Sequence, residues 1–130
     1  MIEQADYRRL MGFWATGVSV VTAAGADGPY GATLNAFSSL SLEPPLLLVC
    51  FDLEARTLGA IRDSGRFCVN MLSAEQEEIS RRFVGKRPMA EKFAELPWAQ
   101  DHGVPLLDDC LAAVVCDVAQ EVEAGDHAIV

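Results

Sequence analysis

The sequence lacks any long apolar run. Its longest uninterrupted runs, Leu46 to Phe51 and Cys110 to Cys116, have six and seven residues, far short of the ~20 that a membrane-spanning helix needs. The first ten residues, MIEQADYRRL, carry charges of both signs and lack the apolar centre of a signal peptide. We therefore expect a soluble, cytoplasmic protein.

Several motifs that mark nucleotide or hydrolase sites are also missing. The chain has no G-x-G-x-x-G between a strand and a helix and no G-x-x-x-x-G-K-[ST], which disfavours a dinucleotide-binding fold. It has no G-x-S-x-G elbow either. With only two histidines, His102 and His127, we expect no metal cluster.

The cysteines show neither zinc nor disulfide spacing, because no C-x-x-C pair is present. Each of them lies in or beside an apolar, strand-like segment, where a buried free thiol is the favoured interpretation. The four cysteines are Cys50, Cys68, Cys110 and Cys116.

Basic residues are absent from the last part of the chain. All ten Lys and Arg lie at or before Lys92, whereas residues 93–130 carry eight acidic side chains. The net charge of −9 argues against non-specific nucleic-acid binding, which depends on neutralising phosphates. The acidic segment is either a set of solvated loops or a surface that faces a basic partner. The sequence ends inside an alternating apolar run, GDHAIV, so we expect a C-terminally truncated fragment.

What is present is enough for one folded domain over residues 1–130, because half of the residues are hydrophobic. Apolar periodicity predicts helices over residues 5–15, 55–64 and 89–95 and another after Ser73, where Gln76 completes a capping box. Gly65 is expected to end the second helix. Strand patterns cover residues 18–24, 30–38, 46–53, 66–72, 111–122 and 128–130, with loops around Pro97 and Pro105.

These patterns predict a mainly β fold of about six antiparallel strands in hairpin order, with short helices beside them. A small closed or partly closed β-barrel with peripheral helices fits this order best.

Polar side chains precede the most apolar strand in the stretch GATLNAFSSLSLEPPLLLVCF, residues 31–51. Buried polar groups are unfavourable unless they are hydrogen-bonded. Either the protein pairs them internally or a polar ligand does so. The side chains concerned are Thr33, Asn35, Ser38, Ser39 and Ser41.

Two further segments are candidates for binding an anion. In DLEART a strand runs into a helix start that carries Arg56 and Thr57, and a helix N-terminus offers free N–H groups. In SRRFVGKR, the only basic cluster surrounds Phe83. Simple helix capping and a solvated charged face are the alternatives. Together with the polar stretch, these segments suit a ligand with a flat polar ring and a phosphate. The turn at His127 is either a plain hairpin or a ligand-facing imidazole.

The ordered motifs T-x-N-x-F-S-S-x-S-x-x-P-P, G-R-F-x-V-N and G-D-H resemble the flavin reductase-like, FMN-binding split-barrel family. Members of that family are reductase components of two-component flavin monooxygenases, and the resemblance runs from about Tyr7 to Val130. It implies a homodimer of split β-barrels that bind FMN or FAD near the subunit interface. It also implies that NADH or NADPH passes a hydride to the flavin, which then serves a partner oxygenase.

The resemblance also implies roles for individual residues. Positions beside the flavin ring would be Thr33, Leu34, Asn35, Cys50, Phe51 and Asp52. Positions near the ribityl–phosphate arm and the outer part of the cofactor would be Ser38, Ser39, Arg56, Thr57, Arg82 and Phe83. His127 would lie near the nicotinamide.

Other functions stay open from the residues alone. They are a flavin-binding module without turnover, a flavin-dependent reductase of another acceptor such as a corrinoid, and a purely structural barrel. The sequence also leaves open the choice between FMN and FAD and between NADH and NADPH.

Overall fold

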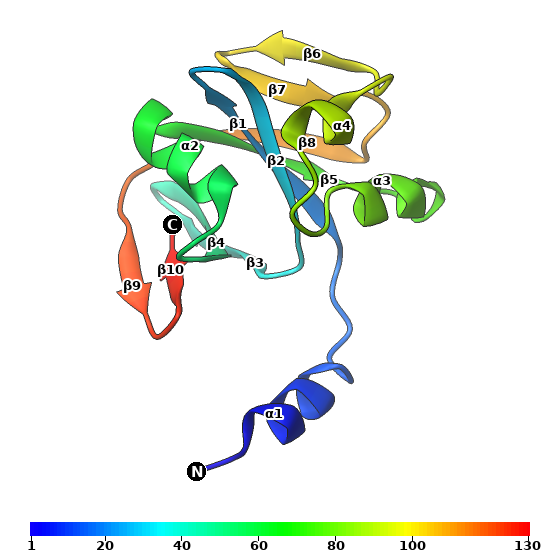
Figure 1. Ribbon diagram of the computed structural model, residues 1–130. Coiled ribbons are helices and arrows are strands. Elements are labelled where there is room, and N and C mark those ends of the chain that lie inside the picture. Colours follow the sequence, from blue (N-terminus) through cyan, green and yellow to red (C-terminus); the bar gives the residue numbers. More distant parts are fainter.

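Strands dominate the chain, and the computed structural model describes all of residues 1–130 (Figure 1). The first sheet has the strand order β2–β1–β5–β8, and each of its pairs is antiparallel. Val20 and Val21 in its inner strand β1 are fully buried, where β-branched side chains pack well. The four strands are β1 (Ser19–Gly25), β2 (Gly28–Leu34), β5 (Arg66–Met71) and β8 (Ala112–Asp117).

The second sheet has the order β3–β4–β10–β9, and a separate hairpin pairs β6 with β7 at the top of Figure 1. These pairs are antiparallel too, which confirms the mainly β, antiparallel split-barrel prediction. Two sheets and a hairpin are present in place of one closed ring. The strands are β3 (Phe37–Leu42), β4 (Pro45–Asp52), β6 (Trp98–Asp101), β7 (Val104–Leu107), β9 (Val122–Ala124) and β10 (His127–Ile129).

The helices lie at the periphery, as the sequence predicts. α2 (Arg56–Ser64) ends at Gly65, whose φ of 70° is left-handed and therefore favours glycine. A 3₁₀ turn, η1 (Ala74–Gln76), leads into α3 (Glu77–Arg82), and the Ser73 N–H donates to Gln76 Oε1 at 2.9 Å. This contact confirms the expected cap. The remaining two are α1 (Gln4–Met11), which stands apart from the sheets in Figure 1, and α4 (Met89–Phe93).

Every helix is too short or too polar to cross a lipid bilayer.

Two hydrophobic clusters form the core. The larger one fills the space between the two sheets and α2, and its members include Phe51, Phe67 and Leu58. The smaller one joins β1 to the segment between α3 and β7. Within it the rings of Phe83 and Phe93 lie nearly perpendicular to each other, with centroids 4.9 Å apart. The members of the smaller cluster are Val20, Phe83, Phe93 and Leu107.

Gly31 is required where β2 crosses the smaller cluster. A Cβ at this position would lie 2.6 Å from Cε1 of Phe83, which is closer than carbon atoms can approach. The lack of a side chain lets the ring of Phe83 lie directly on the strand.

Asn70 in β5 connects its own strand to β1 of the same sheet and to β7 of the separate hairpin. Its amide nitrogen donates to the Val20 carbonyl at 2.9 Å and to the Thr22 hydroxyl at 3.0 Å, and its oxygen accepts the Leu107 N–H at 2.9 Å. The Thr22 hydroxyl in turn donates to the carbonyl of Pro105. Because Asn70 and Thr22 are both fully buried, this network fixes the β6–β7 hairpin onto β1 and β5.

Three sequence-based assignments are wrong. The predicted strand 30–38 is two strands in different sheets, because the Phe37 N–H bonds the Asn35 carbonyl and turns the chain. The predicted strand 111–122 covers only Ala112–Asp117, and Val122 begins the separate strand β9 of the second sheet. Pro105 lies in β7 and not in a loop, because β7 pairs with β6 in a hairpin that the sequence pattern does not indicate.

Two other differences are smaller. The first helix covers Gln4–Met11 in place of residues 5–15. The cysteines are free thiols, but only Cys68 is fully buried and the other three are half-buried.

We expect Asn70→Leu to lower the free energy of unfolding by about 2–4 kcal/mol, because it leaves buried backbone groups without partners. Urea unfolding followed by circular dichroism measures this change. Asn35→Ala is the control. Because Asn35 is exposed, this substitution should change the free energy of unfolding by less than about 0.5 kcal/mol. A similar decrease in the free energy of unfolding of both variants would show that the buried hydrogen bonds of Asn70 add no stability of their own.

Candidate functional site

The crossing between β2 and β3 lies against the end of β4. The Cys50 N–H donates to the Ala36 carbonyl at 3.0 Å, so the residues predicted to line a ring converge here. Asn35 is exposed at this crossing, while Leu34 and Cys50 are half-buried. The Thr33 hydroxyl donates to the Ser80 carbonyl at 2.6 Å and is therefore already paired within the chain. The polar stretch is thus partly satisfied internally and partly open to a ligand.

His127 is brought to the same region by strand pairing. In the β4–β10 register His127 lies opposite Asp52, and Ala128 lies opposite Phe51. Phe51 is buried in the larger core cluster, whereas Asp52 and His127 are exposed. Predicted ring and nicotinamide positions therefore occupy one end of the second sheet.

The imidazole of His127 is oriented by its neighbour. Its Nδ1 lies 2.7 Å from the Asp126 carboxylate. Because an ionised carboxylate only accepts, the protonated Nδ1 donates this hydrogen bond, and Nε2 is the ring nitrogen left for a ligand. The hydrogen bond and the charge of His127 lower the pKa of Asp126, which keeps it ionised.

The start of α2 offers unused donors. The first three N–H groups, those of Arg56, Thr57 and Leu58, have no acceptor in the chain, and Ala55 at the N-cap has no side chain that could provide one. The Arg56 side chain is exposed and is held by one hydrogen bond, from Nη2 to the Arg87 carbonyl at 2.6 Å. An uncapped helix N-terminus beside a guanidinium is suited to an anion.

Thr57 supplies the structural test of whether a phosphate-bearing group fits this place. Its side chain is 1% exposed, and its hydroxyl is the one buried side-chain polar atom without a hydrogen-bond partner. Native proteins pair nearly all such groups, so an orphaned hydroxyl at the helix start indicates a missing acceptor. The donor set at the start of α2 therefore fits a phosphate.

Arg82 and Phe83 are occupied within the chain. The guanidinium of Arg82 donates to the carbonyls of Glu91 and Ala94, which ties α3 to α4. The ring of Phe83 is buried in the smaller core cluster against Phe93. Contact of these two residues with the outer part of a cofactor stays a prediction. The contacts that the structure shows for them are with other residues of the chain.

Ser38 and Ser39 are exposed on β3, and the Ser38 hydroxyl donates to the Ser39 carbonyl at 3.0 Å. Ser39 also borders an open apolar groove of about 650 Å³ between β3, β4 and the β8–β9 segment. Ser39 is the one predicted cofactor position that lines it, so this groove is distinct from the α2 start.

The three cysteines outside the β2–β3 crossing are poorly suited to thiolate chemistry. Burial raises the pKa of Cys68 to about 12 and raises the pKa values of Cys110 and Cys116 as well. A thiol that stays protonated is a poor nucleophile and a poor metal ligand.

One residue of this region carries no sequence signal. Lys92 on α4 is 2% exposed and donates from Nζ to the carbonyls of Phe83 and Gly85. A single lysine in a short polar segment is normally interpreted as a solvated side chain. Only the tertiary structure shows that this one is buried.

The chain is a small antiparallel β domain of split-barrel type in which the donors at the start of α2 are unpaired. The profile of the flavin reductase like domain matches residues 11–130. The chain therefore belongs to the flavin reductase-like family.

Relatives and solved structures agree with this assignment. The chain is 40% identical to the flavin-dependent monooxygenase reductase subunit HsaB of Mycobacterium tuberculosis, and the match covers 99% of the chain and 68% of that protein. It is also 40% identical to a flavin reductase (NADH) of Kitasatospora aureofaciens, with coverages of 100% and 69%. The NADH:FAD oxidoreductase SgcE6 of Streptomyces globisporus C-1027 superposes with a TM-score of 0.90 at 34% identity, covering 99% of this chain and 80% of that one.

We expect Thr57→Val to raise the free energy of unfolding of the ligand-free protein by about 1–2 kcal/mol, because it removes an unpaired buried hydroxyl at nearly constant shape. Chemical denaturation in phosphate-free buffer measures this gain. Thr22→Val is the matched control: its hydroxyl is buried but fully paired, so the same substitution should destabilise. Equal destabilisation by both changes would contradict the assignment of Thr57 as a residue that awaits an acceptor.

Proposed function

We propose that this protein is an NAD(P)H:flavin oxidoreductase that transfers a hydride from NAD(P)H to FMN or FAD and supplies reduced flavin to a partner monooxygenase. The observation that carries the proposal is the start of α2, where three free N–H groups, Arg56 and the orphaned Thr57 hydroxyl lie together. Family membership and the names of relatives, which include NADH-dependent flavin reductases and a monooxygenase reductase subunit, support it.

The start of α2 would hold the phosphate. The guanidinium of Arg56 supplies charge, and the N–H groups supply directed donors at the positive end of the helix dipole. The Thr57 hydroxyl would gain the acceptor that the chain does not provide.

The β2–β3 crossing would hold the ring. Asn35, Ser38 and Ser39 are exposed there, and their amide and hydroxyl groups can pair with the polar edge of a flavin. Donors at this edge would also stabilise negative charge that develops on a reduced ring. Leu34 and Cys50 offer half-buried apolar surface beside them.

His127 would position the nicotinamide. Its Nδ1 is held by Asp126, which leaves Nε2 unpaired next to the end of β4. Bound flavin supplies a ring that accepts two electrons as a hydride, and the nicotinamide supplies that hydride. The chain's contribution is to hold the two rings in contact, at roughly 3–3.5 Å between reacting atoms.

The active form would be a homodimer. No residue of α1 is buried, and the segment after it exposes 82% of Phe13 and 72% of Trp14. Exposed apolar surface of this extent on a small domain typically marks an interface. The predicted cytoplasmic location would give such a dimer access to nicotinamide nucleotides and to its oxygenase.

We expect anaerobic stopped-flow mixing with NADH to bleach the FMN or FAD absorbance band in the presence of the protein, well above the protein-free rate. His127→Ala should slow this reduction about tenfold or more, because the nicotinamide loses a positioning contact. His102→Asn is the control and should leave the rate unchanged, since His102 lies in the distant β6–β7 turn with a φ of 49°, which asparagine tolerates. Flavin binding without reduction would contradict the enzyme assignment and favour a binding module.

We also expect Trp14→Glu to convert the dimer into monomers in sedimentation velocity at micromolar concentration, because it places a charge in the predicted apolar interface. Gln4→Glu adds the same charge to the polar start of α1 and should leave the dimer intact. A wild-type protein that sediments as a monomer would contradict the dimer proposal.

A further inference from the structure

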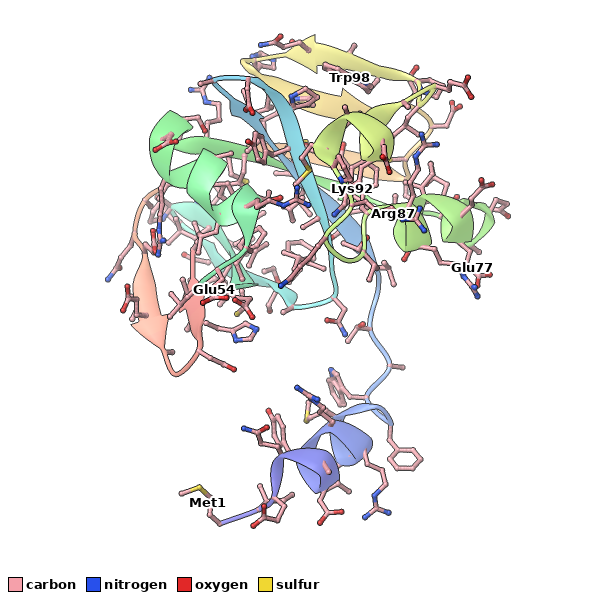
Figure 2. The ribbon with its side chains drawn as sticks, in the orientation of Figure 1. Met1, Glu54, Glu77, Arg87, Lys92 and Trp98 are labelled. Atoms are coloured by element: carbon pink, nitrogen blue, oxygen red, sulfur yellow. The ribbon has the colours of Figure 1, made fainter.

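Lys92 is a buried cation without a carboxylate partner. Its side chain is 2% exposed, and Lys92 forms none of the ion pairs of the chain. Its ammonium group donates to two backbone carbonyls, those of Phe83 at 2.9 Å and of Gly85 at 2.7 Å. In Figure 2 it lies next to Arg87, on the side of the molecule that carries α3 and α4.

This arrangement is electrostatically unfavourable in isolation. Burial and the nearby charges of Arg56 and Arg87 all lower the pKa of Lys92. A buried charge without a counter-ion is destabilising, and an apolar side chain of similar volume would avoid that loss. Three cations therefore gather in a protein whose net charge is −9. A bound anion would offset their mutual repulsion.

The contacts of Lys92 determine the shape of one loop. Lys92 holds the beginning of residues 83–87 through the Phe83 and Gly85 carbonyls, and Arg56 holds the end through the Arg87 carbonyl. The N–H groups of residues 84–87 have no acceptor within the chain. The carbonyls of Phe83, Gly85 and Arg87 thus accept from the cations, while the N–H groups of this exposed loop stay free for a ligand.

The Thr57 hydroxyl at the start of α2 independently favours a ligand at this place, because it is buried and has no partner within the chain. It does not depend on the loop or on Lys92.

We infer that Lys92 is a positioning residue for phosphate recognition: by anchoring the loop of residues 83–87 against Arg56, it completes with the start of α2 a site for the phosphate of the flavin nucleotide. This inference rests on the proposed function. Lys92 does not touch the ligand in this account and acts through the loop that it holds.

The experiment compares two ligands that share the ring and differ in the phosphate, FMN and riboflavin. Their dissociation constants are measured by flavin fluorescence in phosphate-free buffer for the wild type and for Lys92→Met. We expect Lys92→Met to weaken FMN binding roughly tenfold or more and to change riboflavin binding less than about twofold, because only the phosphate contacts depend on the loop.

A charge control separates local positioning from the general field of the protein. Arg81→Met removes the same charge from neighbouring α3, where Arg81 is exposed and paired with Glu77. It should leave both affinities within about twofold of the wild type, because exposed charges are screened. Lys92→Arg keeps a cationic donor, and it should retain most of the FMN preference even if Lys92→Met proves too unstable to measure.

The remaining outcomes overturn the inference in distinguishable ways. If folded Lys92→Met loses FMN and riboflavin equally, or binds FMN like the wild type, Lys92 does not position a phosphate site. If the wild type binds both ligands equally well, the protein is a flavin binder without a phosphate site, and the proposed function survives alone. If the wild type binds neither flavin, the proposed function fails and the inference fails with it.

Discussion

The hydrogen-bonded side chain of Asn70 is the contact on which the arrangement of the site depends. It joins β1 and β5 to the backbone of β7, and Thr22 adds a second bond to the same hairpin. Leu107 of β7 is thereby held in the smaller core cluster with Phe83 and Phe93. Those two rings bracket the loop of residues 83–87 and α4, so a polar contact in the sheet interior determines where the basic loop lies.

A second constraint is the change of sheet between β2 and β3. Because the chain turns at Asn35, the polar stretch ends up at the rim between two sheets and not on the face of one strand. This explains how hydroxyl and amide groups can adjoin the most apolar strand without being buried. Asn35, Ser38 and Ser39 are exposed there, while Val49 and Phe51 of the adjacent strand are in the core.

The charged side chains of the protein also fall into two regions. The acidic C-terminal part is exposed and partly neutralised by ion pairs, such as the pair of Arg62 with Glu121. Arg56, Arg87 and Lys92 form no ion pair, and Arg56 is directed by a backbone carbonyl. A protein with a large negative charge thus keeps an unneutralised positive region, which is the electrostatic condition for binding an anionic nucleotide.

Many local structural features of this protein follow from the sequence by itself. Local patterns predicted the Gly65 stop, the Ser73–Gln76 cap, the antiparallel hairpins and the helix start at Arg56, because each depends on residues close together in the chain. The ordered motifs also led to the family that the comparisons show. Only the tertiary structure decided that residues 30–38 divide between two sheets, that Pro105 joins a strand, that Phe83 is a core residue and that Lys92 is buried. The physical reason is that these outcomes depend on partners far away in the sequence, whose hydrogen bonds and packing override local propensity.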